Sequence, residues 1–68
     1  MQNFRYAAAI FDENGEDQGP VDLSSAQNDD QARDLAKQEG MKWLVENGCN
    51  RATVRISRNG YMLSVEVP

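Results

Sequence analysis

Histidine is absent from the 68-residue sequence, and Cys49 is its only cysteine. A single cysteine cannot form a disulfide within the chain, and without histidine the sequence lacks the commonest metal ligand and the commonest general base of proteins. Cysteine–histidine and serine–histidine catalytic pairs are therefore excluded. We expect Cys49 to be a small, half-buried loop residue rather than a reactive thiol.

Long apolar segments are also missing. No run approaches the roughly 18 apolar residues of a membrane-spanning helix. The apolar run from Tyr6 to Phe11 is too short for the core of a signal peptide, and acidic residues follow it directly. With a single cysteine, these features indicate a reducing, cytoplasmic location.

Motifs that carry chemistry are absent as well. The sequence contains no phosphate-binding loop, no G-x-G-x-x-G and no G-x-S-x-G. The acidic segment from Asp12 to Asp17 does not fit a calcium-binding EF-hand, which needs glycine at its sixth position, whereas Gly15 is fourth when Asp12 is first. A domain this small also offers little concave volume for a substrate. We therefore expect no enzymatic activity, no cofactor and no bound metal.

Basic residues are outnumbered, with 7 Lys and Arg against 11 Asp and Glu and a formal charge of −4. This balance opposes nonspecific binding to nucleic acid or to anionic membranes. We treat residues 1–68 as one small domain, whose single core would supply about 3 to 5 kcal/mol of net stability. Since neither a disulfide nor a metal is expected, oligomerisation is the remaining source of added stability.

Two Asn-Gly pairs are the strongest structural signal, because Asn and Gly tolerate the positive φ angles of a tight hairpin turn. Asn59-Gly60 joins predicted strands at about 51–58 and 61–67, with Arg58 opposite Tyr61. The alternation of apolar and polar residues then gathers aliphatic side chains on one face. They are Ala52, Val54, Ile56, Leu63, Val65 and Val67.

The other pair, Asn14-Gly15, predicts a second hairpin with strands at about 3–11 and 18–23. A two-residue turn there places Ala8 opposite Val21, so that the apolar positions again meet on one side. Pro20 cannot donate a ladder hydrogen bond, which predicts that its strand lies at a sheet edge.

Between the hairpins, one amphipathic segment predicts a helix at about 29–47. Asn28 or Asp29 is the expected N-cap, and Gly48 is the expected left-handed C-cap. At 100° per residue, one arc of the helix should face the sheet, with Trp43 as the largest side chain of the core. The arc contains Ala32, Leu35, Ala36, Trp43 and Leu44.

The order of elements predicts an α+β fold of two layers, ββαββ, in which one helix covers one face of a four-stranded antiparallel sheet. A right-handed crossover from the second strand to the third favours the strand order 2-1-3-4. The order 2-1-4-3 is the alternative.

The C-terminal half of the helix is the first candidate site. Met41 and Val45 lie about 160° from Trp43 on the helical wheel, so the last two turns are apolar nearly all round. A bend at Gly40 or a covering loop would account for this pattern, and so would a contact surface for a second copy or another protein. On the second interpretation, the predicted partner-binding residues are Met41, Leu44 and Val45.

The open face of the sheet is the second candidate site. Arg5, Arg51 and Arg55 should project there, with Arg58 near the turn, and a merely solvated face is the first interpretation of this pattern. The other interpretation is a surface that binds an anion, an acidic protein or single-stranded nucleic acid. Nucleic-acid platforms normally present aromatic rings, and only Phe11 is placed to serve. The sequence therefore predicts a non-catalytic interaction module, with self or a protein as its partner. A nucleic-acid-binding or regulatory module is the alternative, acting through Arg5, Arg51, Arg55 and Arg58.

Overall fold

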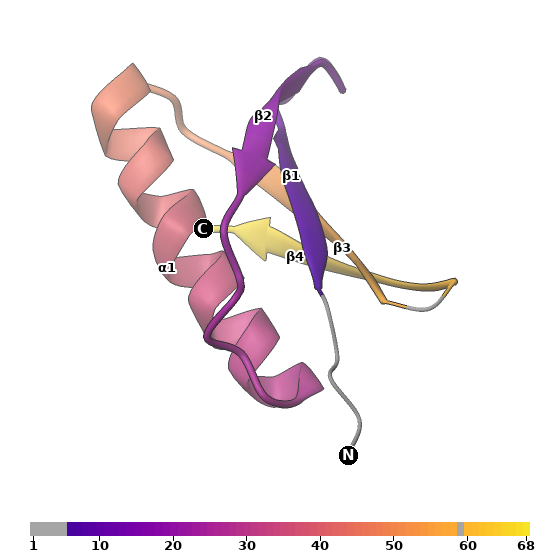
Figure 1. Cartoon of the computed structure of the whole chain (residues 1–68). Coiled ribbons are helices and arrows are strands. Elements are labelled where there is room, and N and C mark those ends of the chain that lie inside the picture. The colour runs from indigo at the N-terminus through magenta and orange to yellow at the C-terminus, as the bar shows by residue number, and fades with distance from the viewer. Residues whose placement is uncertain (1–5, 59) are drawn as a thin grey trace.

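The computed structural model describes residues 6–58 and 60–68, which form a four-stranded antiparallel sheet with one helix on one face (Figure 1). The sheet order is β2-β1-β3-β4, as predicted, and the alternative 2-1-4-3 is wrong. The predicted start of the first strand, at residues 3–5, lies outside the described residues. The elements are β1 (Ala7–Phe11), β2 (Asp17–Val21), α1 (Asp29–Asn47), β3 (Ala52–Arg58) and β4 (Tyr61–Val67).

The hairpin of β3 and β4 has the predicted register throughout, from Ala52 opposite Val67 to Arg58 opposite Tyr61. Gly60 has a φ of 83°, the positive value that a tight turn requires, while Asn59 lies outside the described residues. Turn chemistry and hydrophobic alternation agree here, so the aliphatic face meets the helix as predicted. Fully or nearly buried on it are Ala52, Val54, Ile56 and Val67.

The hairpin of β1 and β2 differs from the prediction, because its loop has three residues rather than two. The Gly15 N–H donates to the Asp12 carbonyl (2.9 Å), and the Asp12 N–H donates to the Glu16 carbonyl (3.0 Å). The loop is therefore Glu13-Asn14-Gly15, with Gly15 at a φ of 80°. This geometry is that of a turn followed by a glycine bulge, the next most common hairpin after the two-residue form.

The side chain of Asp12 explains the longer loop. Its carboxylate accepts hydrogen bonds from the backbone N–H groups of Asn14 and Glu16, each at 2.9 Å, and from Nε2 of Gln18 at 2.8 Å. An aspartate that binds the backbone two residues onward stabilises a turn of its own. The acidic segment is thus ordered by one of its own carboxylates.

A second irregularity restores the predicted pairing in the rest of the hairpin. The longer loop places Phe11 opposite Asp17, one residue away from the predicted register. The register then shifts between Ala9 and Phe11, on the stretch of β2 that contains Gly19 with a φ of 120°. Beyond the shift, Ala8 lies opposite Val21 as predicted. The apolar side chains of β1 and β2 therefore still face the core.

Both predicted helix caps are present. The N-cap is Asn28, whose side chain accepts a hydrogen bond from the Gln31 N–H at 2.9 Å. Gly48 ends the helix in the left-handed conformation, with a φ of 63°. Cys49 follows as a half-buried loop residue and donates its N–H to the Leu44 carbonyl at 3.0 Å.

Mostly small helical residues face the sheet, and Trp43, predicted to be the largest side chain of the core, lies at the margin of the core instead. Trp43 is half-buried at one flank of the helix, where it packs against the core together with Leu35. A Cβ atom added to Gly40 would lie 2.6 Å from a methyl carbon of Val67 and 3.2 Å from one of Val54. Gly40 therefore lets the helix lie close to β3 and β4. The buried helical residues, spaced four apart, are Ala32, Ala36, Gly40 and Leu44.

The connection from β2 to α1 also contributes to the core. Figure 1 shows it running alongside the helix, and Leu23 and Ala26 within it are buried. In the part of the chain that the structure describes, no helix is long and apolar enough to cross a membrane.

Candidate functional site

The flank of α1 that faces β4 carries two exposed apolar side chains. Met41 is 42% exposed and Val45 is 81% exposed. Each follows a buried residue, Gly40 or Leu44, by one position, which is about 100° around the helix. We call the surface formed by Met41 and Val45 the β4-side flank.

The direction of this flank follows from the topology. Asp29 lies beside Arg58 at the end of β3, and Gly40 lies against Val54 near its start, so α1 runs antiparallel to β3. The crossover from β2 over the sheet to β3 is right-handed, as expected for such connections. In a right-handed helix in this orientation, a residue one position after a sheet-facing residue is rotated toward β4. Met41 and Val45 therefore point to the β4 edge.

Leu44, predicted to belong to the partner-binding surface, is instead a core residue. Its side chain is 6% exposed, because it continues the line of sheet-facing residues that runs through Ala36 and Gly40. The candidate contact surface on the helix is therefore limited to Met41 and Val45.

Beside this flank lies the free edge of β4, which sequence reasoning did not identify as a site. Arg58 and Tyr61 close the hairpin, and a closing pair of this kind is hydrogen-bonded. In an antiparallel ladder, hydrogen-bonded pairs alternate with pairs whose N–H and C=O groups point outward. The outward groups of β4 therefore belong to Met62, Ser64 and Glu66. Strand order and register together could have indicated this edge.

The predicted arginine face is not assembled as expected. Arg55 is exposed on the open sheet face, where its guanidinium lies 4.7 Å from the centre of the Phe11 ring. Arg58 lies on the opposite, helix-covered side, because it continues the alternation of Val54 and Ile56. Arg5 lies outside the described residues.

Arg58 takes part in a polar cluster at the N-terminus of the helix. Its Nε lies 3.2 Å from Oδ1 of Asp29, and the Tyr6 hydroxyl donates a hydrogen bond to the same oxygen at 2.9 Å. Partial removal from water, together with the bond to the negatively charged Asp29, raises the pKa of the Tyr6 phenol. The cluster joins the segment before β1, the end of β3 and the start of α1, which is a structural role.

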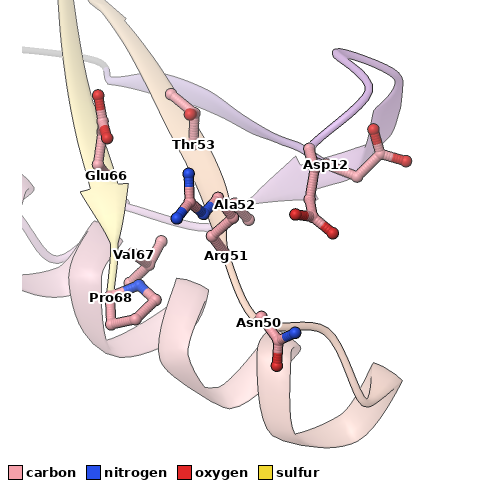
Figure 2. A pocket seen from close by; sticks show the side chains of 9 residues that line it. Asp12, Asn50, Arg51, Ala52, Thr53, Glu66, Val67 and Pro68 are labelled. Carbon is pink, nitrogen blue, oxygen red and sulfur yellow. The ribbon is translucent and has the colours of Figure 1, made fainter.

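Arg51, the remaining predicted anion-binding residue, lines a depression of about 440 Å³ at the end of the sheet (Figure 2). In Figure 2 the carboxylates of Asp12 and Glu66 lie on either side of Arg51, and Glu13 also lines the depression. Three carboxylates around one guanidinium oppose the binding of a phosphate or another anion. Among the described residues, no group of three or more Cys, Asp or Glu side chains could hold a metal ion.

A second, shallower hollow of about 280 Å³ lies on the open sheet face. Its walls are mostly apolar, and Met62, 61% exposed, borders it. Only Arg55 supplies a charge among its lining residues, which are Ala7, Ala8, Ala9, Phe11, Arg55, Ile56, Ser57 and Met62. The hollow lacks the convergent polar groups that orient a small ligand.

Comparison with known proteins found no matching family model, no matching curated protein and no matching solved structure.

Proposed function

We propose that this chain is a non-catalytic interaction module that binds a protein partner through the β4-side flank of α1. The observation that carries the proposal is the exposure of Val45 and Met41 beside a strand edge with outward-pointing backbone groups. Burying a side chain of this size contributes about 1.5 to 3 kcal/mol. The flank therefore offers apolar contact, and the edge next to it offers directional hydrogen bonds.

The alternative, a nucleic-acid-binding module, has less support. Its arginines lie at separate places: Arg55 over Phe11, Arg58 beside Asp29 and Arg51 among carboxylates. Nucleic-acid binding requires several cations along one groove, usually interleaved with exposed aromatic rings.

Site-specific photocrosslinking in the cells that make the protein tests the proposal. A photoreactive residue in place of Val45 should give discrete protein adducts, which mass spectrometry identifies. The matched control is the same residue in place of Gln38, which is exposed on the same helix and should give none.

The substitution Val45→Glu should abolish binding of the captured partner. It should also leave the free energy of unfolding within about 0.5 kcal/mol, because the side chain is exposed. A photoreactive residue at position 45 that gives no adduct above the Gln38 control would contradict the proposal.

A further inference from the structure

We propose that the partner of the β4-side flank is a second copy of this chain, joined to the first by antiparallel pairing of their β4 edges. The two sheets would then form one continuous eight-stranded sheet around a two-fold axis near the middle of β4. This inference rests on the proposed function, because it names the partner that the flank would meet.

The bonding pattern of β4 suits strand addition. The outward N–H and C=O groups of Met62, Ser64 and Glu66 form a regular row, and β4 contains no proline, glycine or lysine. Proteins usually protect an edge with such residues or with a bulge, because an unprotected edge pairs readily with another chain. Two such edges, related by a two-fold axis, satisfy each other's donors and acceptors.

The charge distribution favours this edge for self-association. Two copies of a chain with a formal charge of −4 repel each other, so they should meet where carboxylates are scarce. The only charged side chain of β4 is Glu66, close to one end of the strand. An antiparallel arrangement about the middle of β4 keeps the two copies of Glu66 apart, because each lies on its own side of the axis.

The position of the helix gives a second, independent fit. Gly40 contacts both Val54 of β3 and Val67 of β4, so α1 lies over the space between these strands. With about 4.8 Å between strands, the axis of α1 lies about 5 Å from a two-fold axis placed half a strand spacing beyond β4. The two helix axes would therefore be about 10 Å apart, close to the usual distance of packed helices.

The helices are also needed for a stable interface. Specific interfaces bury about 1,200 Å² or more in total, and two short paired edges are small against this requirement. In the paired arrangement the two helices would lie side by side on one side of the sheet. Because Gly40 lies against Val67, at the end of β4 away from the two-fold axis, Met41 of each copy would lie beside the start of the other copy's helix. Met41 would then be covered by the same event that pairs the strands, whereas Val45, one turn further from the axis, would lie at the rim of the interface.

Sedimentation velocity, from micromolar to millimolar concentration, tests the inference with the variants Ser64→Pro and Ser64→Ala. Proline removes an outward N–H that β3 does not use, so it blocks the edge and leaves the intrachain ladder intact. The wild type and Ser64→Ala should dimerise alike, while Ser64→Pro should raise the dissociation constant by at least about tenfold. Circular dichroism checks that each variant is folded.

A synthetic chain that carries an N-methyl group on the Ser64 amide keeps the side chain and removes the same donor. It replaces Ser64→Pro in the test if the proline variant does not fold, and it should dissociate in the same way.

The outcomes separate this inference from the proposed function. A wild-type dimer that survives both Ser64 changes but dissociates in Val45→Glu would overturn strand pairing and keep the helical flank as a binding surface. A wild type that remains a monomer at millimolar concentration would overturn the second copy as partner, while crosslinking of a different protein at position 45 would still support the proposed function.

Discussion

The two edges of the sheet, β2 and β4, differ in nearly every property that governs pairing with another strand. β2 has five residues, contains Gly19 and Pro20, and follows an acidic turn. β4 has seven residues in unbroken register with β3, and its only charged side chain is Glu66. Irregularity, proline and repelling charge protect an edge. The chain therefore protects one of its edges and leaves the other open.

The edges also differ in how each is held to the rest of the molecule. β4 lies directly under the helix, with Val67 against Gly40. β2 depends on its hairpin with β1, where the carboxylate of Asp12 accepts three hydrogen bonds. The open edge is thus fixed by close apolar packing, and the protected edge by polar bonds near its turn.

The largest effect should come from breaking the contact that holds β4. Gly40→Val would force a branched side chain into the space that the Val67 and Val54 methyl groups occupy. We expect the free energy of unfolding to fall by about 2 to 3 kcal/mol, measured by chemical denaturation. Gln38→Val, at an exposed position of the same helix, is the control and should cost less than about 1 kcal/mol. Equal losses in the two variants would show that close approach at Gly40 is unimportant.

On the β2 side, Gly19→Ala should cost about 1 to 2 kcal/mol, because a φ of 120° is strained for an L-residue. No atom lies within 4 Å of the added Cβ, so the cost is one of backbone conformation. A synthetic chain with D-alanine at position 19 is the matched control and should retain or exceed wild-type stability. If L-alanine and D-alanine have the same effect on thermal unfolding, the irregular backbone of β2 is not what requires glycine.

A smaller effect should follow from removing the carboxylate that orders the β1–β2 turn. Asp12→Ala deletes three exposed hydrogen bonds, and we expect a loss of about 1 kcal/mol in the free energy of unfolding. Glu13→Ala, in the same loop, should change stability by less than about 0.5 kcal/mol. The β3–β4 hairpin should keep its amide chemical shifts in both variants. A similar cost for both substitutions would mean that Asp12 does not direct this turn.

The smallest effect concerns Tyr6, which lies at the end of the sheet between the two edges. Its pKa is raised above the ordinary value of 10.0 by partial removal from water and by the bond to Asp29. Above pH 10.0 the unfolded phenol ionises before the folded one, so stability should decline as the pH rises toward the folded pKa. Tyr6→Phe should remove this part of the alkaline decline. Identical alkaline unfolding profiles for the wild type and Tyr6→Phe would show that ionisation of the Tyr6 phenol does not cause this loss of stability.

Sequence patterns predicted the β3–β4 side of the fold better than the β1–β2 side, and the reason is physical. Around Asn59-Gly60, hydrophobic alternation and turn chemistry require the same register, so each supports the other. Around Asn14-Gly15, the same turn signal competes with the side chain of Asp12, whose hydrogen bonds stabilise a longer loop. The register shift beside Gly19 then restores the pairing of the apolar residues beyond it. The apolar pattern is therefore the same for a two-residue and a three-residue loop.

The candidate sites were likewise predictable from the sequence only in part. The exposure of Met41 and Val45 was predictable, because a helical wheel directs them away from the sheet. The sequence also indicated on which side of the sheet Arg58 lies, since this residue continues the alternation of Val54 and Ile56. The role of Gly40 was not predictable, because a glycine inside a helix normally indicates weakness or a bend rather than a close contact with a neighbouring strand.

The central claim is that the outward amides of β4 pair with a second copy, and amide hydrogen exchange measured against protein concentration tests it most directly. The amides of Leu63 and Val65, which bond to β3, should be protected at every concentration. Those of Met62, Ser64 and Glu66 should exchange rapidly in dilute solution and become protected as the concentration rises. Rapid exchange of these three amides at all concentrations would contradict the account.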